Sequence, residues 1–262
     1  MVLLLTGLIA VVSSAAAPDP WRLSLLLVAM LGSQLSIGWS NDYLDRQLDA
    51  RHQPWKPLVS GAVDPRLLPV AIGFALLASL AAGLVLGALP MLFLVLGTGC
   101  GLGYNLWLKR TRYSLLAFVL AFIVLPLFVW TSLDLFRYSF LALYPIGLSL
   151  PIAVHVANVL PDLEADGEQG RITIAVGLGR PRSVALIMAC EVAPLPLIAL
   201  STVWLDYDWV LFAGPLAAHA VLSLAAGFLY VSSKTRGSAV WAFRLLVTAS
   251  IAFAGGWLAA LR

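Results

Sequence analysis

Charged side chains are scarce in this sequence. Asp, Glu, Lys and Arg make up only 11% of the 262 residues, whereas 61% are hydrophobic, and a soluble domain carries about 25% charged residues. So few charges cannot cover a surface that faces water, and most of the exterior must therefore contact lipid. The net charge of +3 comes without a basic patch, so we expect no nucleic-acid partner.

Cysteine is also scarce. The two cysteines, Cys100 and Cys190, both lie inside apolar runs. Two such residues cannot build a disulfide framework or a zinc site. The redox compartment and the oligomeric state therefore stay open.

Long apolar runs, by contrast, fill most of the chain. Nine apolar segments are able to cross a hydrocarbon core about 30 Å thick, which takes roughly 20 helical residues. The runs are too long for strands and lack strict alternation. We therefore expect an all-α integral membrane protein: nine transmembrane helices in one bundle, a single domain over residues 1–262, with a polar chamber facing the cytoplasm. The expected segments are residues 2–17, 22–43, 67–88, 90–108, 114–133, 139–160, 183–205, 209–231 and 241–261.

The first segment ends in Ser-Ser-Ala-Ala-Ala-Pro, which resembles a signal-peptide cleavage site. It lacks the positively charged start that such peptides carry, so we expect a retained helix, with processing as the alternative.

The basic residues are distributed by loop. Thirteen of the sixteen Lys and Arg residues follow even-numbered segments, and only Arg22, Arg137 and Arg262 lie on the opposite side. Cytoplasmic loops carry an excess of Lys and Arg. The pattern therefore predicts an N-terminus inside and a C-terminus outside a cell or inner membrane.

Acidic residues gather at the ends of the second and sixth segments, which hold seven of the thirteen. In each of these two windows an Asn is followed by an Asp four residues later and another Asp four residues after that. Residues at this spacing lie along one face of a helix. The repeated spacing indicates a parallel internal repeat with both windows on the cytoplasmic side. The first window contains Asn41, Asp45 and Asp49, and the second contains Asn158, Asp162 and Asp166.

Stacked carboxylates repel one another, and near lipid they normally face a polar cavity or a ligand. A divalent cation reverses that repulsion, because Mg²⁺ binds one or two carboxylates together with substrate phosphates. Two such windows could hold metal ions around a diphosphate and neutralise its charge as it departs. The alternative, that these are merely solvated helix ends, is disfavoured by the matched spacing.

The stretch NDYLDRQLDARHQPWKPLVSGAV resembles the first Asp-rich motif of the UbiA superfamily of intramembrane prenyltransferases, including the Lys-Pro and Ser-Gly that follow it. The stretch DLEADGEQGRITIAVGLG resembles the second motif. The resemblance covers nearly the whole chain. It implies Mg²⁺-dependent transfer of a prenyl group from a prenyl diphosphate to an apolar or aromatic acceptor within the bilayer, in isoprenoid or quinone biosynthesis.

The resemblance also implies roles for individual residues. Tyr104 and Lys109 match a Tyr and a Lys that contact the diphosphate, although Lys109 also fits the topological excess of cations. Many relatives place Arg directly after the last Asp, where this chain has Gly167, and Arg171 could supply that charge. The implied catalytic residues are Asp45, Asp49, Asp162 and Asp166, which with Asp42 would hold the metal. The implied substrate-binding residues are Asn41, Asn158, Tyr104, Lys109 and Arg171.

Several alternatives remain open at this point. An aromatic acceptor is expected first, with transfer to a phosphorylated sugar or glycerol, or a membrane terpene cyclase, as alternatives. A cation-coupled transporter with a two-fold repeat would place its acidic residues near the bilayer midplane. His155, one turn before Asn158, could face the site or be structural, and Glu191 is an intramembrane carboxylate without a partner visible in the sequence.

Overall fold

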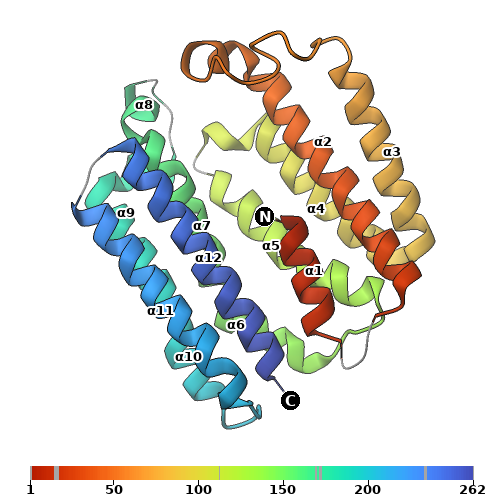
Figure 1. The fold of residues 1–262 in the computed structure, drawn as a ribbon, viewed down its shortest axis with the longest axis vertical. Helices are drawn as coiled ribbons and strands as arrows, with labels where there is room; N and C mark the ends of the chain where they lie inside the picture. The colour runs from red at the N-terminus through yellow and green to blue at the C-terminus, as the bar shows by residue number, and fades with distance from the viewer. Residues whose placement is uncertain are drawn as a thin grey trace. The chain divides into compact units, whose positions relative to one another are not determined.

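The computed structural model describes residues 2–14, 18–111, 113–168, 170, 173–232 and 235–261, and the regular elements in these residues are helices (Figure 1). The all-α prediction is therefore confirmed. The chain divides into two compact units. Unit 1 comprises Met1–Lys109 and Leu120–Leu135, and unit 2 comprises Arg110–Val119 and Phe136–Arg262. Each unit contains one acidic window. The single domain over residues 1–262 stays a prediction.

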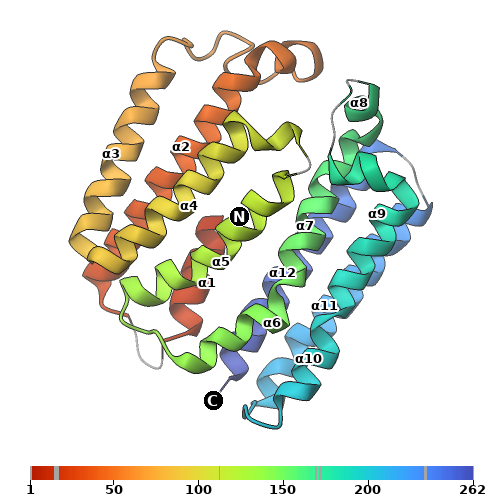
Figure 2. The ribbon, with the colours of Figure 1, turned by 180° about the vertical axis from the view of Figure 1, so that it is seen from behind.

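Unit 1 is built on three helices that lie side by side, α2 (Pro20–His52), α3 (Leu68–Leu86) and α4 (Ala88–Leu106) (Figures 1 and 2). The remaining helices with residues in this unit are α1 (Val2–Val12), η1 (Leu108–Arg110) and α5 (Ser114–Ser132), which is shared between the units.

Helix α2 begins at a formed cap and is unusually long. The side chain of Asp19 accepts a hydrogen bond from the Trp21 N–H, and Pro20 occupies the first turn, where a missing N–H is harmless. Its 33 residues give about 50 Å at 1.5 Å per residue, more than a hydrocarbon core of roughly 30 Å. The helix can therefore cross the bilayer and carry its last turns, with the first acidic window, beyond the apolar region.

Small residues hold α2 in place. An added Cβ at Gly32 would collide with Ser79 of α3, and the Ser79 hydroxyl donates to the Ala29 carbonyl at 2.7 Å. Toward α4, the hydroxyls of Ser33 and Thr98 share a 2.8 Å hydrogen bond. Close approach at small residues and interhelical hydroxyl bonds are how helices associate in lipid. These contacts fix the helix that carries the first window.

Unit 2 packs α11 against α12, with α7 and α9 beside them (Figures 1 and 2). Its elements are η2 (Tyr138–Ala142), α6 (Leu143–Gly147), α7 (Ser149–Val159), η3 (Leu160–Asp162), α8 (Leu163–Glu168), α9 (Ile174–Val192), α10 (Pro194–Ser201), α11 (Trp209–Ser232) and α12 (Arg236–Ala260).

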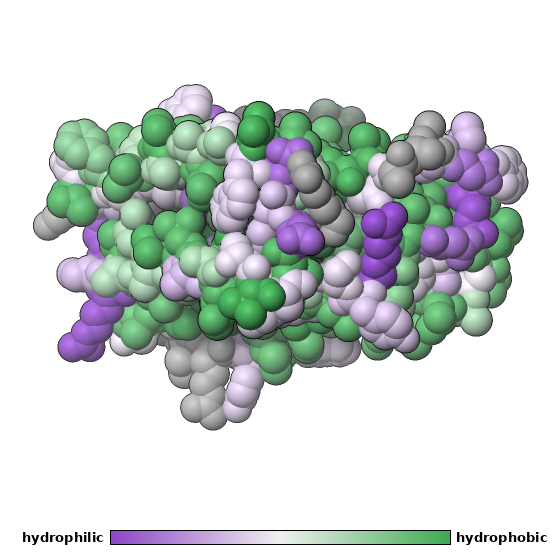
Figure 3. Space-filling view, turned by 90° about the horizontal axis from the view of Figure 1, so that it is seen from below, coloured by the Kyte–Doolittle hydropathy of each residue, from purple (hydrophilic) through white to green (hydrophobic). Residues whose placement is uncertain are grey.

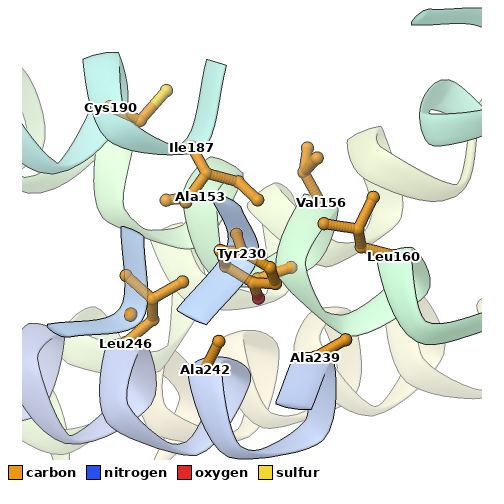
Figure 4. Close-up of a cluster of buried hydrophobic side chains, with 11 residues drawn as sticks. Ala153, Val156, Leu160, Ile187, Cys190, Tyr230, Ala239, Ala242 and Leu246 are labelled. Atoms are coloured by element: carbon orange, nitrogen blue, oxygen red, sulfur yellow. The ribbon is translucent and has the colours of Figure 1, made fainter. Parts of the chain in front are cut away.

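The core of unit 2 joins helices α7, α9, α11 and α12. Side chains of Val156, Ile187, Tyr230 and Leu246 converge there (Figure 4). Leu160, which directly precedes the Pro-Asp of the second window, belongs to the same buried cluster. The second window is therefore anchored at its base by the core.

The number of spans differs from the prediction. In the described residues, seven helices are long and apolar enough to cross a membrane, or up to eight if the bent pair Tyr138–Gly147 and Ser149–Asp162 forms one span. Nine transmembrane helices are therefore not confirmed. The first expected segment, residues 2–17, contains a helix of only 11 residues, α1, whose length of about 16 Å is half the hydrocarbon thickness.

The sixth expected segment, residues 139–160, is broken rather than continuous. Its two halves meet at an angle of 42°. Pro145 and Pro151 flank the break, and each lacks the N–H that would continue the helical ladder.

The helix at the seventh expected segment, residues 183–205, is α9, which begins at Ile174, before the apolar run. Thr173 caps this start, because its hydroxyl accepts a backbone hydrogen bond. Gly179 then takes a φ of 72° at a kink before Pro181, a conformation that glycine adopts without strain. The capping signal was present in the sequence but lies outside the apolar run.

Large apolar side chains cover much of the outer surface. Phe74, Val210 and Phe228 are 69%, 88% and 70% exposed. Figure 3, seen from the lower end of Figure 1, shows apolar residues interspersed with smaller groups of hydrophilic residues. Together with the long apolar helices, this surface suits lipid rather than water, and the protein is an integral membrane protein.

Candidate active site

The first acidic window occupies the last third of α2. The helix is continuous to His52, so Asn41, Asp45 and Asp49 follow one another along it as their spacing predicts. The window lies at a helix end beside a loop, rather than in the middle of the helix.

Lys109 binds the beginning of this window. Its Nζ donates to both carboxylate oxygens of Asp45 at 2.7 Å and to Oδ1 of Asn41 at 3.1 Å. The side chains of Lys109 and Asp45 are only 14% and 16% exposed. The predicted substrate-binding lysine and one predicted metal ligand are thus brought together.

The end of α4 fixes the position of Lys109. The Asn105 side chain is nearly buried, and its Nδ2 donates to the Ile37 carbonyl at 2.7 Å and to Ser40 Oγ at 3.0 Å. These bonds hold the end of α4 against α2, and the short helix η1 then places Lys109 beside the window. Tyr104, one residue earlier on α4, is half-buried, and its role stays a prediction.

Lys56 binds the other carboxylates of the first window. Its Nζ donates to Oδ1 of Asp42 at 2.9 Å and to Oδ2 of Asp49 at 2.8 Å. Gln53 Nε2 approaches Oδ1 of Asp49 at 3.4 Å. Asp49 is the most buried member, with a side chain 7% exposed. The window is therefore divided between two lysines.

The environment of Lys56 favours its charged form. Burial alone would lower the pKa of this ammonium, but the hydrogen bonds and negative charges of Asp49 and Asp42 outweigh burial, so the pKa is raised. A cavity of about 310 Å³ adjoins these groups. Apart from Asp42, Asp49, Lys56 and Trp39, its lining is apolar and comes from the loop after α2 and the start of α3.

The second window has a different backbone. α7 ends at Val159 and a 3₁₀ segment, η3, leads into α8. Pro161 lies in this segment, and three residues per turn replace 3.6, so four-residue spacing does not define a single α-helical face here. Asn158 is exposed, Asp162 is about half exposed and Asp166 is nearly buried.

Arg236 is a basic partner of the second window. It begins α12, behind a Thr235 cap, and its Nε donates to Oδ1 of Asp162 at 3.1 Å. The two side chains are 57% and 49% exposed, so the pair is weak, about 0–1 kcal/mol. Arg171, the predicted basic neighbour of this window, lies outside the described residues.

The sequence analysis counted Lys56 and Arg236 only among the basic residues of the loops and assigned them no contact with the windows. For Lys56 a signal existed, because its Lys-Pro was part of the resemblance to the first motif. Arg236 had none, since it lies 74 residues from Asp162 along the chain.

The donor atoms suit a hard divalent cation. Among the described residues, no three His, Cys, Asp or Glu side chains form a ready metal site. Asp42 and Asp49, however, both contact one cationic nitrogen, so two carboxylates can bind a single cation between them. Mg²⁺ is commonly held by one or two carboxylates, with the other ligands from water and substrate phosphates. The window therefore fits Mg²⁺ in the presence of a phosphate substrate.

Two buried polar residues outside the windows contact side chains of neighbouring helices. His155 is fully buried and shares a 3.2 Å hydrogen bond with Ser114, while its ring lies 5.0 Å from that of Phe118. Glu191 has partners on α11 and α12, namely Ser223, His219 and Ser250. Both arrangements are those of structural interhelical contacts.

These features define an integral membrane protein in which basic side chains pair with carboxylates at the ends of helices. The model of the UbiA prenyltransferase family matches residues 1–251. The chain belongs to the UbiA prenyltransferase family, as the motif resemblance predicted, and is an enzyme of the prenyltransferase class rather than a transporter.

Two relatives share a name. The chain is 28% identical over 207 residues to a digeranylgeranylglyceryl phosphate synthase of Methanoregula boonei, across 78% of this chain and 71% of that protein. It is 25% identical over 182 residues to the protein of that name from Korarchaeum cryptofilum, across 68% of this chain and 62% of the relative, which is less than two thirds of its length.

Solved structures share the fold. A structure described as giving insights into digeranylgeranylglyceryl phosphate synthase in membranes has a TM-score of 0.72 at 15% identity, covering 99% of this chain and 92% of the other. A UbiA homologue from Aeropyrum pernix K1 gives 0.71 at 17%, covering 96% and 94%. A UbiA homologue from Archaeoglobus fulgidus bound to Cd²⁺ gives 0.69 at 15%, covering 96% and 95%.

Proposed function

We propose that the protein catalyses Mg²⁺-dependent transfer of a prenyl group from a prenyl diphosphate to a hydroxyl group of a glyceryl phosphate lipid. The observation that carries the proposal is the largely buried contact of Lys109 with Asp45 and Asn41 in the last third of α2. It combines oxygen ligands for a divalent cation with an ammonium that can donate to phosphate oxygens.

The acceptor follows from the names of the two relatives. Digeranylgeranylglyceryl phosphate carries two prenyl chains on a glyceryl phosphate, so the enzymes of that name build a bond to a hydroxyl oxygen rather than to an aromatic carbon. This favours the non-aromatic acceptor, which the sequence analysis held as an alternative, over the aromatic acceptor expected first.

The reaction assigns separate tasks to the two windows. Asp45, Asp49 and Asn41, with Asp42 in support, would hold the diphosphate through the cation, and Lys109, once the cation replaces it on Asp45, would donate to the diphosphate oxygens. By the motif resemblance, Asp162, Asp166 and Asn158 of the second window are proposed to bind diphosphate through metal as well, and Tyr104 and Arg171 are proposed as further diphosphate contacts. Bound Mg²⁺ would supply charge neutralisation for the leaving diphosphate.

Bond changes are simple in this scheme. The bond between the prenyl C1 carbon and the diphosphate oxygen breaks, a bond from C1 to the acceptor oxygen forms, and the hydroxyl proton leaves to solvent or diphosphate. The prenyl tail stays in the lipid throughout. The excess of basic residues on the loops beside both windows supports a head-group site at the cytoplasmic side, with the N-terminus inside and the C-terminus outside.

The test is a product assay with purified protein in lipid nanodiscs. Labelled geranylgeranyl diphosphate and Mg²⁺ are supplied with a geranylgeranylglyceryl phosphate, with 4-hydroxybenzoate or with no acceptor, and lipids are identified by mass spectrometry. Of the three acceptor conditions, we expect a prenylated lipid product only with the geranylgeranylglyceryl phosphate. Prenylated aromatic product, or a cyclised hydrocarbon in the absence of acceptor, would refute the assignment. The Asp45→Asn variant is the matched inactive control.

A further inference from the structure

Lys56 makes a contact that the proposed chemistry does not use. Its ammonium lies between two carboxylates that are seven residues apart on α2, at 2.9 Å from Asp42 and 2.8 Å from Asp49. Both carboxylates are candidate metal ligands. A carboxylate oxygen that binds a divalent cation cannot at the same time keep an ammonium at that distance, because the two like charges repel.

The backbone at Lys56 is held independently of its ammonium. The Lys56 N–H donates to the Gln53 carbonyl at 3.1 Å, and its own carbonyl accepts from the N–H groups of Val59 and Ser60 at 2.9 and 2.8 Å. These turns do not involve the side chain. The ammonium can therefore leave the carboxylates while the loop keeps its fold.

A displaced ammonium needs another anion. The cavity of about 310 Å³ beside Lys56 provides space, but apart from Asp42 and Asp49 it is lined by neutral, mainly apolar side chains such as Leu58 and Val63. A lysine charge left there without a partner would be unfavourable. The diphosphate of a prenyl substrate bound to the same cation brings anionic oxygens to this place.

We propose that Lys56 is an exchangeable counter-ion: a divalent cation displaces it from Asp42 and Asp49, and the released ammonium then binds the diphosphate. The proposal rests on the proposed function, since it names a further binding residue of that site. Lys56 opposes binding of the metal alone and favours binding of the diphosphate. It therefore adds to the coupling between the two ligands.

This role predicts opposite effects of one substitution. In Lys56→Gln the carboxylates no longer have a competing cation, so Mn²⁺ alone should bind about 3- to 10-fold more tightly. The same variant should bind a non-reactive prenyl thiolodiphosphate, at saturating Mn²⁺, about tenfold more weakly. A residue that only holds the loop would weaken both ligands or neither.

The experiment is a Mn²⁺ titration of purified full-length protein, followed by electron paramagnetic resonance without substrate, and then a titration with the thiolodiphosphate. Lys56→Arg keeps the positive charge and should bind Mn²⁺ no more tightly than the wild type. Arg66→Gln is the matched control, since Arg66 is an exposed cation on the same loop, and it should change neither affinity. Melting temperatures establish that each variant is folded.

The proposal is overturned if Lys56→Gln binds Mn²⁺ alone as the wild type does or more weakly, or if Lys56→Arg matches Lys56→Gln. Failure of the proposed function has a different signature, because the wild type would then form no prenylated glyceryl phosphate whatever the Mn²⁺ titrations show.

Discussion

Replacing Lys109 with methionine is expected to destabilise the protein as well as inactivate it. The ammonium makes two contacts of 2.7 Å with Asp45 and one of 3.1 Å with Asn41, all mostly buried. Removing one partner of a buried ion pair costs about 3–5 kcal/mol, because the other charge is left in a poor solvent. Allowing for the partial exposure of Asp45, we expect a loss of about 3 kcal/mol.

The assay is thermal unfolding in detergent, followed by tryptophan fluorescence. Lys109→Met should lower the melting temperature by several degrees, and Lys109→Met combined with Asp45→Asn should recover more than half of that loss, because the double variant contains no lone charge. Both should be inactive. Equal melting temperatures for the wild type and the single variant, or a double variant less stable than the single one, would refute this reasoning.

An exposed pair provides the comparison. Arg236→Met removes the contact with Asp162, in which both partners are about half exposed, and should cost less than about 1 kcal/mol. If Arg236→Met lowered the melting temperature as much as Lys109→Met, burial would not be what distinguishes the two pairs.

Three further predictions concern the reaction. Activity should disappear with EDTA and return with Mg²⁺ but poorly with Ca²⁺, whose coordination is longer and looser; full turnover without metal would contradict the diphosphate clamp. Asp45→Asn and Asp162→Asn should each reduce kcat about 100-fold and together little more, as for residues that act as a unit; multiplicative losses would mean independent windows. With both native cysteines replaced, cysteines at the exposed positions Ser60 and Gly167 should react with an impermeant thiol reagent in inside-out vesicles but not in intact cells, and a cysteine at the exposed position Asp206 should do the reverse; labelling of the first two from outside would overturn the topology.

Much of the fold follows from one-dimensional patterns, and the exceptions have local causes. Apolar length predicts the long spans but says nothing about where a helix starts, so α9 begins at the Thr173 cap, well before its apolar run. The same length criterion cannot detect the break between α6 and α7, which depends on prolines on either side of it. Helix α1 shows the opposite error, because an apolar composition continues past its last helical residue, Val12.

The candidate site was also only partly predictable from the sequence. Spacing on α2 predicted which acidic residues belong together, and Lys109 was expected from the motif resemblance. The spacing could not predict that two lysines share the window. Lys109 binds Asn41 and Asp45, and Lys56 binds Asp42 and Asp49. That division depends on how α4 and the loop after α2 pack on the helix, which no repeat within α2 encodes.

Glu191 makes the same point for a residue in the apolar part of the protein. In the sequence it is a lone carboxylate, but in the structure it is 1% exposed, Ser223 donates to Oε2 at 2.8 Å and Ser250 to Oε1 at 3.5 Å. Nε2 of His219 lies 3.0 Å from the Glu191 carbonyl, and its Nδ1 lies 3.3 Å from the Ala249 carbonyl and 3.6 Å from the carboxylate. Both ring nitrogens of His219 lie near oxygen atoms, so this side chain links α11 to α9 and α12. The partners of Glu191 come from α11 and α12, and periodicity within one helix predicts its polar positions but not which helix will contact them. Packing therefore explains this carboxylate without assigning it a part in prenyl transfer.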